Sequence, residues 1–167
     1  MNIVERLFEN EDADPIDIVE TLAQHYQWDF DRITEDQIAV AIEGSWRTYG
    51  VTLSSLSFDE TLRIICSFEM NPPKEMINNL LETINLANNK VWNGSFVFAQ
   101  KQQLMMFRYG VNLTGGARVT ANQIDSIVEN AIAACEQFYP SFQLTCWGNE
   151  SPEDSLLIAF DKIYGRA

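Results

Sequence analysis

The residue types that most often carry chemistry are few in this sequence and widely separated. His25 is the only histidine, so a histidine-rich metal site is excluded and a Ser-His-Asp triad would depend on this residue alone. Cys66 and Cys135 fall on apolar faces, where a thiol behaves as a small hydrophobic side chain. Cys146 stands beside Trp147 in a predicted strand, with no visible base to stabilise a thiolate. We therefore expect no catalytic residue, no metal and no cofactor.

Two loop sequences resemble ligand-binding motifs at first sight. In NEDADPID, Asp12 and Asp14 have the spacing of the first EF-hand ligands, but Pro15 follows and no glutamate stands at the twelfth position. We interpret this segment as an acidic helix start. In LTGGAR, Gly115 and Gly116 precede a predicted helix by several residues, without G-x-G-x-x-G or the lysine of a P-loop. This segment is typical of a loop between a strand and a helix.

Three charged residues provide one enzymatic alternative. Glu43, Glu69 and Arg63 alternate with apolar residues, which predicts that they lie on the wet face of a sheet. Carboxylates beside an arginine could serve a small enzyme. An enzyme also needs a concave site with convergent polar groups, whereas a binding module needs only a groove or an apolar patch. The shape of this face therefore separates the two hypotheses.

The composition limits the partners that the chain can bind. Its 24 acidic and 11 basic residues give a net charge of −13, which opposes binding to nucleic acid or to an anionic membrane surface. The beginning of the sequence becomes acidic before an apolar run develops, so we expect no secretory signal. Three cysteines without C-x-x-C spacing favour reduced thiols and a cytoplasmic location.

Four helices are predicted to position these residues, and each has a recognisable start. Asp14 can cap the first helix, and Pro15 suits its first turn. Thr120 and Gln123 have the spacing of a capping box for the third helix, which Pro140 is expected to end. The predicted spans are 15–26, 72–91, 121–139 and 152–163, each with apolar residues at helical spacing.

Apolar and polar residues alternate between the helices. The clearest segments are 38–42, 49–53 and 62–70, and two further strands lie within Gly94–Gly116. The expected order is helix, three or four strands, helix, two strands, helix, short helix. We predict an α+β fold with a twisted antiparallel sheet of about five to six strands and helices packed mainly on one face. Residues 1–13 are expected to be loose, and 14–167 to form one domain.

The Gly94–Gly116 hairpin is apolar on both predicted faces. In its second strand, Phe107 and Val111 share the face that suits burial under helices. The other face is predicted to form a protein-binding or dimer patch, unless the last helix covers it, because contiguous apolar patches mark interaction sites. The candidate patch contains five residues: Phe96, Phe98, Leu104, Met106 and Arg108.

Three ordered segments resemble the YbjN family of bacterial sensory transduction regulators. They are VWNGSFVF, LMMFRYGVNLTGG and AACEQFYPSFQLTCWGNESPED, and the resemblance extends over about residues 14–164. It implies a fold similar to type III secretion chaperones, with helices on one side of a twisted antiparallel sheet. Those chaperones are small, acidic cytosolic dimers that bind protein segments without chemistry. The resemblance therefore implies a non-catalytic module with a protein partner and a homodimeric state, and it supplies no functional residues.

Overall fold

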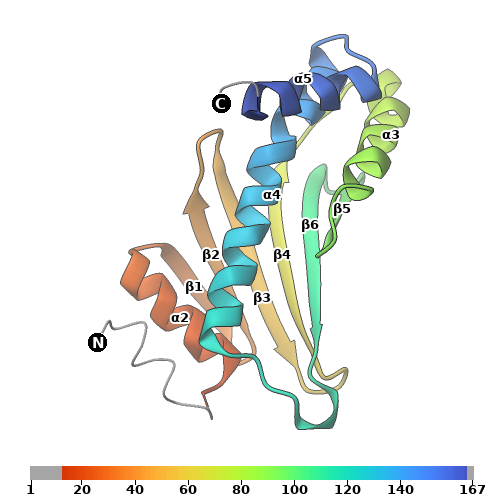
Figure 1. Ribbon diagram of the computed structural model, residues 1–167. Helices are drawn as coiled ribbons and strands as arrows, with labels where there is room; N and C mark the ends of the chain where they lie inside the picture. Colours follow the sequence, from red (N-terminus) through yellow and green to blue (C-terminus); the bar gives the residue numbers. More distant parts are fainter. Residues whose placement is uncertain (1–12, 165–167) are drawn as a thin grey trace.

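A six-stranded antiparallel sheet forms the base of the fold, in the order β1-β2-β3-β4-β6-β5. The computed structural model describes residues 13–164 (Figure 1), so residues 1–12 of the predicted loose segment lie outside the described part. The connection from β4 to the edge strand β5 passes through a helix, and β6 then returns between them. The strands are β1 (Asp29–Thr34), β2 (Gln37–Glu43), β3 (Thr48–Leu56), β4 (Thr61–Glu69), β5 (Ser95–Ala99) and β6 (Leu104–Asn112).

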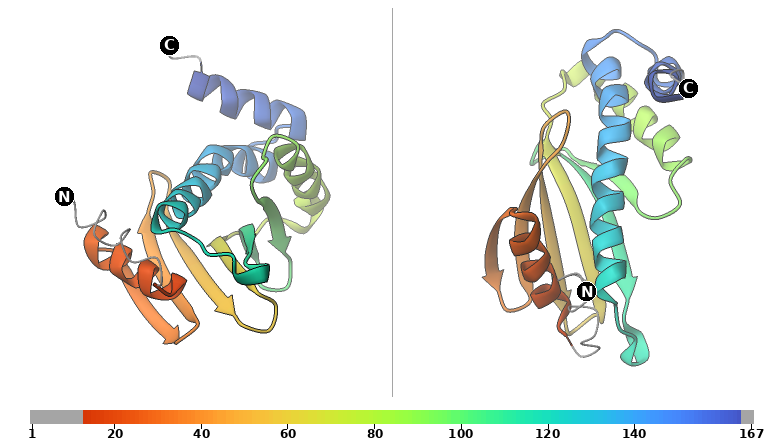
Figure 2. Two further views of the ribbon diagram at one scale, coloured as in Figure 1. Left: turned by 60° about the horizontal axis from the view of Figure 1, so that its bottom comes forward. Right: turned by 60° about the vertical axis from the view of Figure 1, so that its left-hand side comes forward.

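The helices lie on one side of this sheet, and Figure 2 shows the opposite face without a helix. They are α2 (Pro15–Tyr26), α3 (Ile77–Asn88), α4 (Ala121–Trp147) and α5 (Pro152–Tyr164). Helix α4 runs along the sheet, with α2 beside it over the first strands and α3 beside β5 (Figure 1). Short 3-10 turns at Lys74–Met76 and Thr114–Gly116 precede α3 and α4. The predicted fold class, an antiparallel sheet with helices on one face, is confirmed.

Local capping explains where two of the helices begin. The Asp14 side chain accepts a hydrogen bond from the backbone N–H of Ile16 at 2.8 Å, which satisfies a donor that the first turn leaves unpaired. Thr120 and Gln123 form the predicted capping box at the start of α4. Helix α3 begins five residues later than predicted, because residues 72–76 form an extended segment and a 3-10 turn.

Helix α4 does not stop at Pro140, so the predicted end of this helix is wrong. The helix continues to Trp147, and Cys146, expected in a strand, lies in its last turn. A proline inside a helix removes one hydrogen bond and costs about 3 kcal/mol. The turns beyond Pro140 bury Phe142 and Cys146 against the rest of the protein, and the burial of such side chains stabilises the continued helix enough to offset that cost.

Strand β1 has no regular apolar pattern. Its sequence, DFDRIT, pairs with β2 at the edge of the sheet and is exposed along almost its whole length. Neither face of this edge strand is buried, so its residues do not alternate between apolar and polar. Strand β1 is the fourth of the three or four strands expected between the first two helices. The predicted alternation is seen in β2, in β4 and in residues 48–53 of β3, where every second residue is buried.

A chain of buried hydroxyl groups joins the three helices that meet at one end of the molecule. Thr83 of α3, Thr145 of α4 and Ser155 of α5 are fully buried, with 2.9 Å between successive hydroxyl oxygens. The Ser155 hydroxyl then donates to the carbonyl oxygen of Pro152 at 2.8 Å. Each hydroxyl can donate one hydrogen bond and accept another, so buried polar groups on all three helices are paired. Helix α5 is therefore attached to α3 and α4 rather than to the second face of the sheet.

Candidate functional site

The two faces of the Gly94–Gly116 hairpin have different environments. Phe96 lies opposite Phe107 on the neighbouring strand, and residues opposite each other share a face. That face points toward the helices, where Phe96 is 1% exposed and its ring meets Phe107 and Phe138 edge to face. Phe98 is also buried. The prediction that placed Phe96 and Phe98 in an exposed patch is therefore wrong, because strand pairing directs both rings into the core.

The other three patch residues lie on the open face of the sheet. Leu104 and Met106 are half-buried and Arg108 is exposed, and all three come from β6. A hollow of about 760 Å³ opens there, lined among others by Ile65, Met106 and Arg108. No ion pair joins Arg108 to a residue in the described part of the chain. On the helix side of the same strand Phe107 is buried as predicted, whereas Val111 is only half-buried.

The carboxylates of the enzymatic alternative are distant from its arginine. Arg63 and Glu69 are six residues apart on β4, which corresponds to about 20 Å along a strand. Glu43 pairs with Thr48 at the same end of the sheet as Glu69, far from Arg63. Arg63 instead forms an ion pair with Asp59. The three charges thus do not converge on one point of the open face.

The edge strand β5 is protected by a side chain. Asn88, the last residue of α3, accepts a hydrogen bond from the Phe96 backbone N–H at 2.7 Å and donates one to the Phe96 carbonyl at 3.1 Å. One side-chain amide therefore occupies both outward-facing backbone groups of this residue. Unpaired edge strands invite pairing with another chain, and natural proteins block them. Asn88 makes strand addition at this point of β5 unfavourable.

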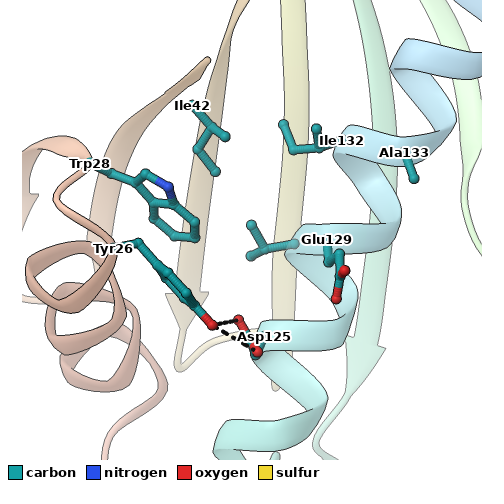
Figure 3. A pocket seen from close by; sticks show the side chains of 8 residues that line it. Tyr26, Trp28, Ile42, Asp125, Glu129, Ile132 and Ala133 are labelled. Atoms are coloured by element: carbon teal, nitrogen blue, oxygen red, sulfur yellow. Dashed lines mark hydrogen bonds between the residues drawn. The ribbon is translucent and has the colours of Figure 1, made fainter. Parts of the chain in front are cut away.

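A second concave region lies on the helix side, between the end of α2 and the first half of α4 (Figure 3). Its volume is about 380 Å³, which is within the range of small-ligand sites. Tyr26 and Trp28 form one wall, with ring centroids 4.8 Å apart and planes inclined by 27°. Aliphatic residues form the floor, and two carboxylates stand on α4. The remaining lining residues are Ile42, Asp125, Val128, Glu129, Ile132 and Ala133.

This groove has a negative electrostatic character. Asp125 and Glu129 are one turn apart on the same side of α4, and like charges at this spacing repel. The Tyr26 hydroxyl donates to the Asp125 carboxylate at 3.2 and 3.3 Å. Partial burial, followed by the charge of Asp125, raises the pKa of Tyr26, so its hydroxyl stays protonated as a donor. Neither carboxylate forms an ion pair with any residue between 13 and 164.

The sequence contains only weak signals for this groove. Tyr26 is the last residue of the predicted helix 15–26, and it is 42% exposed in the structure. Asp125 and Glu129 have helical spacing, which by itself predicts only a solvated face. The groove exists because the fold brings residues 26–28 beside residues 125–133, about 100 positions away along the chain.

The AACEQFYP segment has a structural explanation. The Cys135 thiol lies 3.5 Å from that of Cys66 in the core, and this contact together with burial raises the pKa of Cys135. The Glu136 carboxylate accepts hydrogen bonds from the backbone N–H groups of Ser45 and Trp46, at 2.9 and 3.4 Å. The segment therefore joins α4 to the sheet and to the β2–β3 turn. Both core thiols match the prediction of buried small hydrophobic groups.

The remaining candidates for chemistry lie apart from these regions. His25 is exposed in the last turn of α2, and its ring contacts Tyr26 edge to face. Gly115 and Gly116 have positive φ angles in the loop between β6 and α4. No three His, Cys, Asp or Glu side chains within residues 13–164 come together as metal ligands. No helix in that range is long and apolar enough to span a bilayer.

Comparison with known structures shows which folds this chain resembles. A crystal structure described as "YbjN, a putative transcription regulator from E. coli" superposes with a TM-score of 0.53 at 9% identity, covering 90% of this chain and 93% of that one. A chain of the structure described as "Crystal Structure of the ExsC-ExsE Complex" has a TM-score of 0.52 at 13% identity, covering 83% of this chain and 94% of that one. At these identities the likeness establishes the fold.

Comparison of sequences identifies the family to which this chain belongs. Among curated proteins no sequence matches this chain. A family model described as "Putative bacterial sensory transduction regulator" matches residues 15–144, which include α2, the whole sheet, α3 and most of α4. Since this match covers well over half of the sequence and agrees with the fold, the chain belongs to the YbjN family.

Proposed function

We propose that this chain is a non-catalytic regulatory module of the bacterial cytosol, which binds a segment of another protein on the open face of its sheet. The observation that carries this proposal is the hollow of about 760 Å³ on a sheet face that no described helix covers. The three unpaired cysteines support a reducing compartment. The fold likeness to ExsC, which was solved in a complex with ExsE, supports a protein as the partner.

The chemistry of the hollow suggests what the partner segment presents. Ile65 and Met106 are half-buried and apolar, and methionine adapts to irregular partner surfaces. Arg108 stands beside them without an ion pair to a described residue. We expect an apolar side chain of the partner against Met106 and a neighbouring carboxylate against Arg108, since arginine pairs with carboxylates through two parallel hydrogen bonds.

The enzymatic alternative has less support. It requires Glu43 or Glu69 beside Arg63, and these carboxylates lie at the other end of the open face. A binding role requires no such convergence, and one protein of similar fold was solved in a complex with another protein.

Site-specific photo-crosslinking tests this function directly. A photoreactive phenylalanine analogue at Met106, in the full chain inside its own cells, should give one discrete crosslinked protein that mass spectrometry identifies. The same analogue at Leu81, which is 47% exposed on α3, serves as the matched control and should not crosslink to that protein. The purified partner should then bind the native chain, and Met106→Glu should weaken this binding at least tenfold.

Two results would contradict the proposal. Equal crosslinking from Leu81 and Met106 would place the partner elsewhere or make the capture unspecific. Crosslinks from Met106 only to a second copy of this chain would make the open face a homodimer contact and not a site for another protein.

A further inference from the structure

We propose that the groove between α2 and α4 binds the guanidinium group of an arginine side chain presented by a protein segment. This site lies on the helix side of the sheet and is separate from the open face on which the proposed function rests. The two sites can therefore be tested independently.

The aromatic wall of the groove suits a flat cation. Tyr26 and Trp28 are stacked and line the groove, and Figure 3 shows them on the opposite side of the groove from the α4 side chains, with the Tyr26 hydroxyl directed at Asp125. A cation within about 6 Å of such a ring is attracted by its electron-rich face, most strongly by tryptophan. Arginine adds planar stacking to this attraction and is less strongly hydrated than lysine, so it loses less on leaving water.

The carboxylates across the groove complement the same group. Asp125 and Glu129 are four residues apart, which places their Cβ atoms about 5–6 Å from each other on one side of the helix. A guanidinium has five N–H donors and can reach both carboxylates. Its charge would also relieve the repulsion between them, for which the described residues provide no countercharge.

The lining also explains why the arginine should belong to a protein segment. None of the eight lining residues is basic, so the α-carboxylate of free arginine would find no partner and would be repelled by Asp125 and Glu129. An arginine within a peptide has no such charge. The apolar floor, formed by Ile42, Val128 and Ile132, can receive the aliphatic part of the side chain.

Titrations followed by NMR provide the test. The probe is N-acetyl-L-arginine methylamide, added to the full chain while the indole N–H resonance of Trp28 is observed. We expect a saturable shift at millimolar probe concentrations. The citrulline analogue, which has the same shape without charge, and free arginine should each bind at least fivefold more weakly. Equal binding of the citrulline analogue, or no saturable shift at Trp28, overturns the proposal.

Matched variants locate the effect. Asp125→Asn with Glu129→Gln should weaken probe binding at least tenfold. Glu75→Gln with Glu82→Gln removes the same charge from exposed positions on other elements, and should leave binding within twofold. Tyr26→Leu, which keeps an apolar side chain, should weaken binding, and a thermal melt of each variant confirms folding. Equal losses in the two double variants would reduce the effect to overall charge and overturn the proposal.

The chain itself contains two arginines outside the described residues, Arg6 and Arg166, and Arg6 is the one that precedes α2 in the sequence. The Arg6→Gln variant should bind the probe as the native chain does. Binding that is tighter by tenfold in this variant would make the chain's own N-terminal residues the occupant and overturn the assignment to another protein.

Discussion

Replacing Asn88 by alanine should destabilise the protein through the edge strand β5. The substitution removes the hydrogen bonds of 2.7 and 3.1 Å between the Asn88 amide and the Phe96 backbone. Each such bond contributes about 1 kcal/mol net. Alanine regains about 0.5 kcal/mol through its higher helix propensity. We therefore expect a loss of about 1.5 kcal/mol in the free energy of unfolding, which lowers Tm by roughly 3–6 °C for a domain of this size.

The neighbouring asparagine provides a control of identical chemistry. Asn89 is exposed and its side chain makes none of the hydrogen bonds found among the described residues, so Asn89→Ala should leave stability unchanged or slightly raised. Asn88→Asp separates the two bonds, because aspartate can still accept from the Phe96 N–H but cannot donate to the carbonyl.

Guanidinium denaturation of the variants measures the free energies, and amide hydrogen exchange locates the effect. The Phe96 amide should exchange faster in Asn88→Ala than in the native protein, while amides in β3 should change only in proportion to global stability. If Asn88→Ala and Asn89→Ala unfold at the same denaturant concentration, Asn88 does not hold the edge strand and the reasoning fails.

Three further predictions concern the core, the thiols and association. Thr145→Val interrupts the buried hydroxyl chain and should cost about 1–2 kcal/mol in chemical denaturation, whereas Thr48→Val at an exposed strand position should change little. Burial raises the pKa of Cys146 to about 11, so the folded state holds this proton more tightly than the unfolded chain. The contribution of Cys146 to the free energy of unfolding should therefore be fully present below about pH 9 and be lost as the pH rises through 11. At pH 8 the thiols of the native protein should react with a disulfide reagent far more slowly than those of the denatured protein, and equal rates would contradict this. Light scattering should give the mass of two chains, because the chaperone-like fold leads us to expect a homodimer. A single-chain mass at micromolar concentration would contradict this prediction.

Local signals determined much of the fold from the sequence. The capping residues Asp14, Thr120 and Gln123 specified helix starts, because an N-cap acts on donors within its own first turn. Alternation in β2, β3 and β4 specified an antiparallel sheet with one covered face, because successive residues of a strand point to opposite faces and the apolar ones mark the buried face. The family resemblance was likewise present in the order of short segments.

Tertiary structure decided the features that depend on contacts between distant residues. Helix α4 continues past Pro140 because packing of the turns beyond it offsets the lost hydrogen bond. That packing involves distant residues, so a local sequence pattern does not predict it. The side of Phe96 follows from its pairing with Phe107, since a one-residue change of register would turn it to the other face. The groove of Tyr26, Trp28, Asp125 and Glu129 likewise requires α2 and α4 to meet. Chain segments about 100 residues apart acquire a shared electrostatic environment only when folding brings them within a few ångströms of each other.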